Sequence, residues 1–177
     1  MTCVQTITGL ARDCTKNMGG LKKVYIAPFQ DDLTVTVSDG AISTFTQGTG
    51  APKFKAFNFR AGAASLTKTS QIDATSGTLV VQSQLVMNFG KMDSVKRAEV
   101  QALLQGEVQV IAEDNNGTAW FLGKDAPVVP VGAQNGQTGQ AKTDANQYSI
   151  TLQDESSELP YPFASSTVYS GAIAEVS

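Results

Sequence analysis

The segment Leu79-Val-Val-Gln-Ser-Gln-Leu-Val-Met-Asn-Phe89 carries the clearest structural signal in the chain. Apolar residues occupy positions 79, 81, 85, 87 and 89, whereas glutamine or asparagine occupies positions 82, 84 and 88. Because side chains of a strand alternate between the two faces of a sheet, this pattern predicts a strand with one face in the core. Val80 and Val86 fall on the polar side, which would suit a strand that is covered on both faces.

Alternation of the same kind predicts strands on either side of this segment. Ala64, Leu66 and Ile72 share a parity within a Thr/Ser-rich stretch that leads to a turn at Ser76-Gly77. The other expected strands cover residues 21–27, ended by Pro28, and residues 33–38, 41–46, 108–113, 119–122 and 148–152. Asp39-Gly40 and Asn115-Asn116-Gly117 are expected to form hairpin turns, since these residues tolerate positive φ angles.

One helix is expected, at about residues 94–105. Asp93 or Ser94 would accept hydrogen bonds from the first free amides, and Gly106 would close the far end. Between them, apolar residues recur at helical spacing: Val95, Ala98, Val100, Ala102, Leu103 and Leu104. This pattern is typical of an amphipathic helix of roughly three turns.

Composition places the chain among lightly charged globular proteins. Its 177 residues suit one domain, with 41% hydrophobic and 16% charged residues. The abundance of Thr, Ser, Gln, Val and Gly favours strands and turns. A formal net charge of −3 gives no basic surface for gripping phosphates. The sequence contains no run of about eighteen apolar residues that would suit a membrane span, and its N-terminus does not resemble a signal peptide.

Catalysis is not expected from this composition. The chain has no histidine, which removes the Ser–His and Cys–His pairs and the commonest zinc ligand. The acidic pairs Asp31-Asp32, Glu113-Asp114 and Asp154-Glu155 would point to opposite faces of a strand and lie at strand ends, where acids are ordinarily solvated. The glycines of residues 132–139 lack the Lys-Ser/Thr of a phosphate-binding loop. We therefore expect no catalytic, cofactor-binding or metal-binding residue.

Several segments fall outside the expected strands. Residues 48–53 form one loop and residues 124–147 a long Gly/Gln-rich one, and loops of that length are usually functional. Residues 1–20 are expected to form an arm or a short helix. Residues 156–177 are too apolar for simple disorder, so we expect an extended arm that lies on a neighbouring subunit. A disulfide between Cys3 and Cys14 fits the spacing, although a reducing cytosol favours free, small apolar residues there.

Three segments together carry a family resemblance. They are Gly20-Leu-Lys-Lys-Val-Tyr-Ile-Ala27, Val110-Ile-Ala-Glu-Asp-Asn-Asn-Gly-Thr-Ala-Trp-Phe-Leu-Gly123 and Gly136-Gln-Thr-Gly-Gln-Ala-Lys-Thr-Asp-Ala-Asn-Gln-Tyr-Ser-Ile-Thr-Leu152. In this order they resemble the small tail-tube-type proteins encoded by phages and prophages of gut Bacteroidetes. The resemblance covers roughly residues 1–155, and the segment that follows is longer than the family pattern. Collar or ring proteins of crAss-like phages share tube-like folds and would fit equally.

The resemblance implies a mainly β fold, a sandwich or barrel packed against one helix, as a domain over residues 1–155 with a C-terminal arm over residues 156–177. It further implies homo-oligomeric rings, six-fold or a multiple, whose strands join into a continuous inner barrel. The partners would be other copies of the chain, neighbouring tail or connector proteins, and DNA as a non-specific passenger of the lumen. The protein would be made in the host cytoplasm and reside in the virion, without a cofactor.

The long loops and the C-terminal arm supply the candidate subunit-interface residues. These are Gly48, Gly50, Pro52, Lys53, Gly136, Gly139, Tyr161, Phe163 and Tyr169. Two other functions stay open, namely a head-decoration or baseplate protein of the virion and a carbohydrate-binding β-sandwich. A lectin would be expected to expose an aromatic side chain beside Asp or Asn in a loop, whereas Trp120 is expected within a strand.

Overall fold

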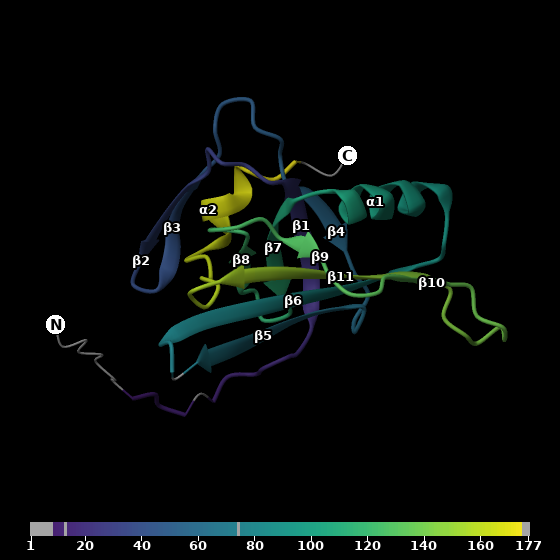
Figure 1. Ribbon diagram of the computed structural model, residues 1–177, viewed down its shortest axis with the longest axis horizontal. Helices are drawn as coiled ribbons and strands as arrows, with labels where there is room; N and C mark the ends of the chain where they lie inside the picture. The colour runs from purple at the N-terminus through teal and green to yellow at the C-terminus, as the bar shows by residue number, and fades with distance from the viewer. Residues whose placement is uncertain (1–8, 13, 74, 175–177) are drawn as a thin grey trace.

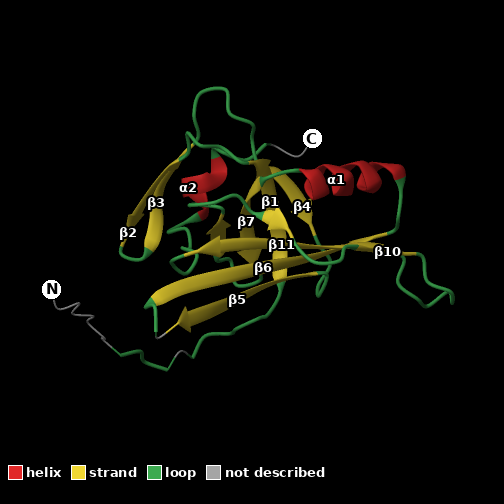
Figure 2. Ribbon diagram, viewed as in Figure 1, coloured by secondary structure: helices red, strands yellow, loops and turns green. Residues whose placement is uncertain are grey.

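The structure, a computed structural model, describes residues 9–12, 14–73 and 75–174. This part of the chain is mainly β, with several antiparallel sheets and two helices (Figures 1 and 2). The strands are β1 (Leu21–Pro28), β2 (Thr34–Ser38), β3 (Ala41–Thr46), β4 (Lys55–Asn58), β5 (Ala64–Asp73), β6 (Thr78–Gly90), β7 (Val108–Asp114), β8 (Ala119–Leu122), β9 (Val129–Pro130), β10 (Asn135–Gln137) and β11 (Gln147–Ser156). The helices are α1 (Ser94–Gln105) and α2 (Ser166–Ser170).

Two antiparallel sheets form a β-sandwich-like core. The core sheet has the strand order β4-β1-β7-β8, and the outer sheet has the order β10-β11-β6-β5, with β9 also paired to β11. Strands β2 and β3 form a separate hairpin that lies beside α2 (Figure 1). Strand β6 is the long central strand of the outer sheet and pairs along its length with both β5 and β11.

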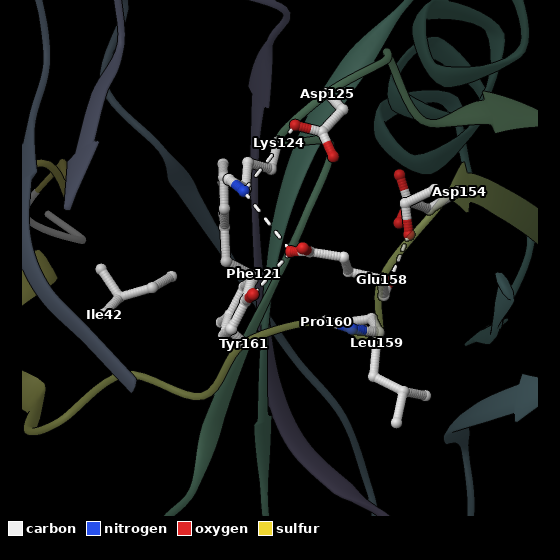
Figure 3. A pocket seen from close by; sticks show the side chains of 10 residues that line it. Ile42, Phe121, Lys124, Asp125, Asp154, Glu158, Leu159, Pro160 and Tyr161 are labelled. Atoms are coloured by element: carbon white, nitrogen blue, oxygen red, sulfur yellow. Dashed lines mark hydrogen bonds and ion pairs between the residues drawn. The ribbon is translucent and has the colours of Figure 1, made fainter. Parts of the chain in front are cut away.

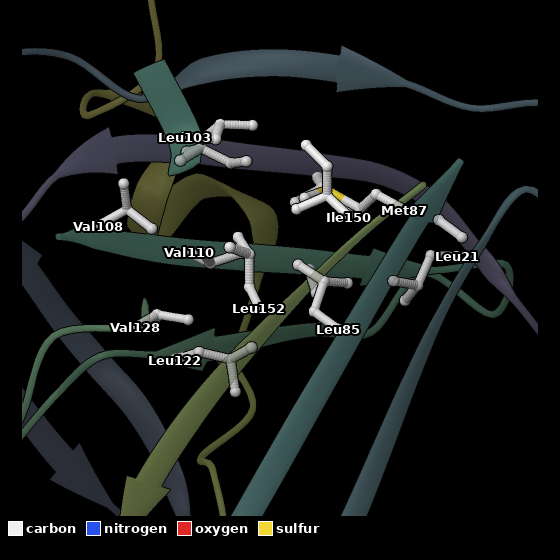
Figure 4. Close-up of a cluster of buried hydrophobic side chains, with 14 of the residues drawn as sticks. Leu21, Leu85, Met87, Leu103, Val108, Val110, Leu122, Val128, Ile150 and Leu152 are labelled. Atoms are coloured by element: carbon white, nitrogen blue, oxygen red, sulfur yellow. The ribbon is translucent and has the colours of Figure 1, made fainter. Parts of the chain in front are cut away.

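The first hydrophobic cluster lies between the two sheets and under α1 (Figure 4). Leu85 and Met87 of β6 meet Val110 of β7 in this cluster, and all three are fully buried. Val100 and Leu103 bring one face of α1 onto it. The odd positions of β6 therefore point into the core, as the alternation in the sequence predicts.

A second cluster covers the opposite face of the core sheet. Tyr25 and Ile111 of this sheet pack there against Phe45 of the hairpin and against Phe163 and Tyr169 of the C-terminal segment. Strand β1 alternates accordingly, because Val24 and Ile26 belong to the first cluster whereas Tyr25 and Ala27 belong to the second. Burial on both faces explains the continuous apolar run of this strand.

The local sequence signals are confirmed. Helix α1 covers the expected residues, with the Asp93 carboxylate accepting the Lys96 N–H at 2.9 Å as its N-cap. Asp39 and Gly40 have φ angles of 53° and 76° at the turn between β2 and β3, as a type I′ turn requires. Strands β7 and β8 pair around the turn at residues 115–117. Along residues 9–12 and 14–20 the arm is exposed and contains no helix.

The C-terminal segment corrects the expectation of an extended arm on a neighbour. Its backbone bonds to β3 and β8, through Ile42 N–H to the Pro162 carbonyl at 2.8 Å and Phe163 N–H to the Ala119 carbonyl at 2.8 Å. It then forms α2, whose Tyr169 is 4% exposed. The physical reason is that the second face of the core sheet is apolar and this segment supplies its cover.

Candidate assembly surface

The outer sheet leaves one face bare. On that face β5 presents Thr67 and Thr69, which pair in register with Gln84 and Gln82 of β6. The same rows continue into Gln153 and Glu155 of β11. Val80 and Val86 on this face are half-buried and Gln84 is exposed, so the described part of the chain does not cover it. The possibility that β6 is covered on both faces is thus not realised within one subunit.

Side-chain amides link the strands across this bare face. Gln84 Nε2 donates to Gln153 Oε1 at 2.9 Å, and Gln82 Nε2 donates to Glu155 Oε1 at 3.1 Å. Gln153 Nε2 also donates to Glu155 Oε1, at 2.7 Å. The face therefore carries many hydroxyls and amides, and its glutamine side chains and the Glu155 carboxylate hold one another in place.

Strand β5 forms a free edge of the outer sheet. It is ten residues long and, among the residues that the structure describes, pairs with β6 alone. The Asn88 N–H donates to the Ala63 carbonyl at 2.8 Å, which makes this facing pair a hydrogen-bonded one. Because bonded and non-bonded pairs alternate along antiparallel strands, the backbone groups of Leu66, Lys68 and Ser70 point away from β6. An unpaired edge of this kind is a template for another strand.

The opposite side of the outer sheet is partly closed. Strand β10 pairs with the start of β11, and β9 pairs with Leu152 and Gln153. Between them the Gln134 side chain substitutes for a strand, since its Oε1 accepts the Thr151 N–H at 2.8 Å and its Nε2 donates to the Thr151 carbonyl at 3.2 Å. The sheet is therefore asymmetric, with one long open edge and one short, mostly occupied edge.

A polar row crosses the buried face of the outer sheet. Lys68 of β5, Ser83 of β6 and Asp154 of β11 occupy facing positions. Ser83 is fully buried and Asp154 is 4% exposed. Burial raises the pKa of Asp154 to about 6, against the lowering effect of the Gly123 N–H bond, with the charges of Asp125 and Glu155 adding to the rise. The expectation that Asp154 is solvated at a strand end is therefore wrong, because β11 continues to Ser156.

Lys68 stacks on the single tryptophan. Its Nζ lies 3.0 Å from the centroid of the Trp120 ring, which belongs to β8 of the facing sheet. Burial lowers the pKa of Lys68 to about 8, although the charge of Asp114 opposes this. Sequence alternation places both residues on inward faces, but their pairing depends on how two sheets far apart in sequence are stacked. The contact turns the charged Lys68 side chain toward the core sheet and away from the bare face.

The predicted interface residues fall into three separate places. Around the 48–53 loop, Lys53 Nζ donates to the Gly171 carbonyl, and the Gln30 and Gln47 amides both donate to the Pro52 carbonyl at 2.9 Å. Gly48 packs closely on its surroundings, since a Cβ there would lie 1.5 Å from Asp32 Oδ2. This loop therefore rests against the chain's own C-terminal segment. Gly50 lies at its exposed tip.

Gly136 and Gly139 lie at the far end of the outer sheet, in and after β10 (Figure 1). Both are exposed. Asp144 organises the loop beyond them, because its Oδ2 accepts the N–H groups of Gln140 and Ala141 at 2.8 Å. The two glycines are thus accessible but are not brought near the 48–53 loop.

Phe163 and Tyr169 are buried in the subunit's own second cluster, at 7% and 4% exposure. Phe163 packs on Phe45 and Tyr169, with ring centroids 5.2 Å and 4.7 Å apart. Their placement at a subunit interface is therefore corrected, because the chain itself provides their partners. Tyr161 is half-buried and donates its hydroxyl to Glu158.

A group of charged side chains lies around Tyr161 (Figure 3). Lys124 Nζ lies 3.8 Å from Asp125 Oδ1 and 3.9 Å from Glu158 Oε2. The cavity beside them measures about 20 Å³, which suits one water molecule and not an organic substrate. Within the described ranges, no three His, Cys, Asp or Glu residues are placed to share a metal ion. Chemically, this region offers ion pairing at a surface.

Cys14 is exposed and free, whereas Cys3 lies outside the described residues. Neither helix of the described chain is long and apolar enough to cross a membrane. No protein-family model, curated protein or solved structure matches this chain.

Proposed function

We propose that this chain is a structural virion protein that assembles into homo-oligomeric rings of a phage tail tube or a tube-like collar. The observation that carries the proposal is the outer sheet, with its ten-residue free edge at β5 and one bare face. A long free edge is an aggregation hazard in a monomer, whereas a neighbouring copy in a ring would close it. In this proposal β5 of one copy pairs beside β10 of the next.

The bare face suits the lining of a conduit for DNA. Its rows carry threonine and glutamine side chains, and the amides of Gln82 and Gln153 hold the Glu155 carboxylate. Asp73, at the end of β5, adds a second carboxylate. The one internal lysine of β5, Lys68, points to the opposite face and stacks on Trp120. Without basic side chains the face offers phosphates no ion pairs, so DNA would pass along it without being retained.

The carbohydrate-binding alternative has less support. A glycan site built around an aromatic platform needs an exposed ring, and Trp120 is half-buried beneath Lys68. A head-decoration or baseplate role predicts a compact oligomer that does not form rings or tubes. Electron microscopy separates these outcomes directly.

The decisive variant is Ser70→Pro, compared with Ser70→Ala. The Ser70 N–H points away from β6, so proline there removes an edge donor without breaking a bond inside the subunit. We expect rings or hollow tubes of the wild-type chain and of Ser70→Ala in negative-stain images, and only monomers of Ser70→Pro. Circular dichroism should show all three folded. Rings formed equally by Ser70→Pro, or a wild-type chain that stays monomeric at every concentration, would contradict the proposal.

A further inference from the structure

One end of the outer sheet is acidic. An open cleft of about 560 Å³ lies there, lined by Leu79, Val80, Lys124, Asp125 and residues 155–158. We call it the acidic end. The acidic end has three carboxylates, on Asp125, Glu155 and Glu158, and one ammonium group, that of Lys124. Lys124 pairs with both Asp125 and Glu158.

The acidic end also exposes apolar surface. Leu79 is 41% exposed and Ile72, its facing residue on β5, is 74% exposed. Both lie on the inner face of the sheet, where it extends past the first hydrophobic cluster. Apolar side chains rimmed by charges are typical of a protein contact surface.

The other end of the same sheet is basic. A cleft of about 730 Å³ there is lined by Arg60, Lys91 and Lys96, by the amides of Asn58, Asn88, Asn146 and Gln147, and by the rings of Phe59 and Phe89. We call it the basic end. Lys96 pairs with Asp93 at 3.4 Å. Arg60 and Lys91 are exposed, and neither has an ion-pair partner among the residues that the structure describes.

The two ends lie at opposite ends of β6. Val80 lines the acidic end and Gly90 the basic end, so ten strand residues, roughly 33 Å, separate them. Figure 1 shows β6 running from one side of the molecule to the other between these positions. The sheet is thus electrostatically polar along its strands in a chain whose net charge is only −3.

We infer that the basic end of one copy docks against the acidic end of the next copy, so that subunits stack head to tail along the direction of β6. Because the two patches lie at opposite ends of β6, an end-to-end contact between two copies leaves one basic end and one acidic end free. The same contact can therefore repeat. This inference deepens the proposed function, on which it rests, because it supplies contacts along the strands in addition to the edge contacts across them.

Two charge-reversal variants test the stacking. Arg60→Glu with Lys91→Glu makes both ends acidic, and Asp125→Lys with Glu155→Lys makes both ends basic. In sedimentation velocity, the amount of stacked species should fall more than about tenfold for each variant alone, because like charges would meet. An equimolar mixture should restore stacking, since each variant then provides the partner that the other lacks. Lys16→Glu with Lys55→Glu is the control, with the same charge change away from both ends.

Salt gives an independent measure. Stacking of the wild-type chain should weaken between roughly 0.05 M and 0.5 M NaCl, where screening shortens to a few ångströms. A chain with all four reversals exchanges the signs of the two ends and should stack again. Reversal variants that each stack like the wild type, or a mixture that restores nothing, would overturn the inference.

The outcomes also separate the inference from the proposed function. Rings that persist in both reversal variants but no longer stack support the two contacts together. Rings that stack in every variant leave the proposed function standing and remove the end-to-end contact. A wild-type chain that is monomeric at both salt concentrations removes both.

Discussion

The core sheet and the outer sheet are both antiparallel, but they differ in how many of their faces are buried. Along the core sheet both faces are buried, and its strands β1 and β7 carry near-continuous apolar runs at residues 24–27 and 110–112. Along the outer sheet only one face is buried, and β6 alternates valine, leucine and methionine with glutamine and asparagine. The core sheet contributes to both hydrophobic clusters, whereas the outer sheet carries the bare polar face and the free edge at β5.

The difference shows which surface of the described chain is available for assembly. The C-terminal segment and the β2–β3 hairpin both cover the second face of the core sheet, whereas no described segment covers the bare face of the outer sheet. A surface left bare beside one that is thoroughly covered is a feature of the fold that assembly would explain.

The largest effect is expected from the core sheet. Phe121→Ala removes a ring that is 3% exposed and packs on Phe45 with centroids 5.1 Å apart. It should lower the free energy of unfolding by about 3–5 kcal/mol. Thr67→Ala on the bare face should change it by less than about 0.5 kcal/mol. Urea denaturation of both variants measures the contrast, and equal losses would contradict the distinction between the sheets.

A smaller effect is expected from Asp154, the weak point on the buried face of the outer sheet. Its pKa in the folded chain is raised from 3.8 to about 6, so the folded state holds the proton over a pH range in which the unfolded state has lost it. Stability should therefore fall as the pH rises through this range and stay level above it. Asp154→Asn should remove the fall and stabilise the chain by about 2 kcal/mol near pH 7.

The measurement for Asp154 is urea denaturation at several pH values between about 4 and 7. Glu155→Gln, the exposed neighbour on the bare face, serves as the control and should keep most of the wild-type pH dependence, because burial is the first cause of the raised Asp154 pKa and the Glu155 charge only adds to it. A wild-type chain whose stability rises with pH over this range would show that the buried carboxylate is not disfavoured.

The smallest effect is expected at the contact between the two sheets. Lys68→Met should change the free energy of unfolding by less than about 1 kcal/mol, the size of a cation–π interaction. Because Trp120 is the only tryptophan, its fluorescence reports on the ammonium above it. The fluorescence should change with a midpoint near pH 8, where Lys68 loses its proton, and Lys68→Met should lack this step. An identical step in the variant would assign the titration to another group.

Features that depend on neighbouring residues could be predicted from the sequence. The alternation in β6, the capped helix α1 and the turn at Asp39-Gly40 are all set by contacts within a few residues. The bare face at β5 also follows partly from the sequence, since its Thr/Ser-rich alternation indicates a long strand with one wet face, whereas the free edge does not follow from it.

Features that depend on distant pairing could not be predicted. Asp154 is buried because β11 lies beside β6, about seventy residues earlier in the chain, and no local pattern signals this. The burial of Phe163 and Tyr169 depends on which face of the core sheet lacks cover. The sequence indicates only that the C-terminal segment is too apolar to be solvated, and a neighbouring subunit or the chain itself could satisfy that requirement.

Hydrogen exchange along β5 reports whether the free edge is paired in assemblies. We predict that the amides of Leu66, Lys68 and Ser70 exchange fast in the monomer and become strongly protected in assembled protein. The Thr67 amide, bonded to β6, should be protected in both states. Edge amides that exchange equally fast in rings and in monomers would show that the subunits associate by another surface.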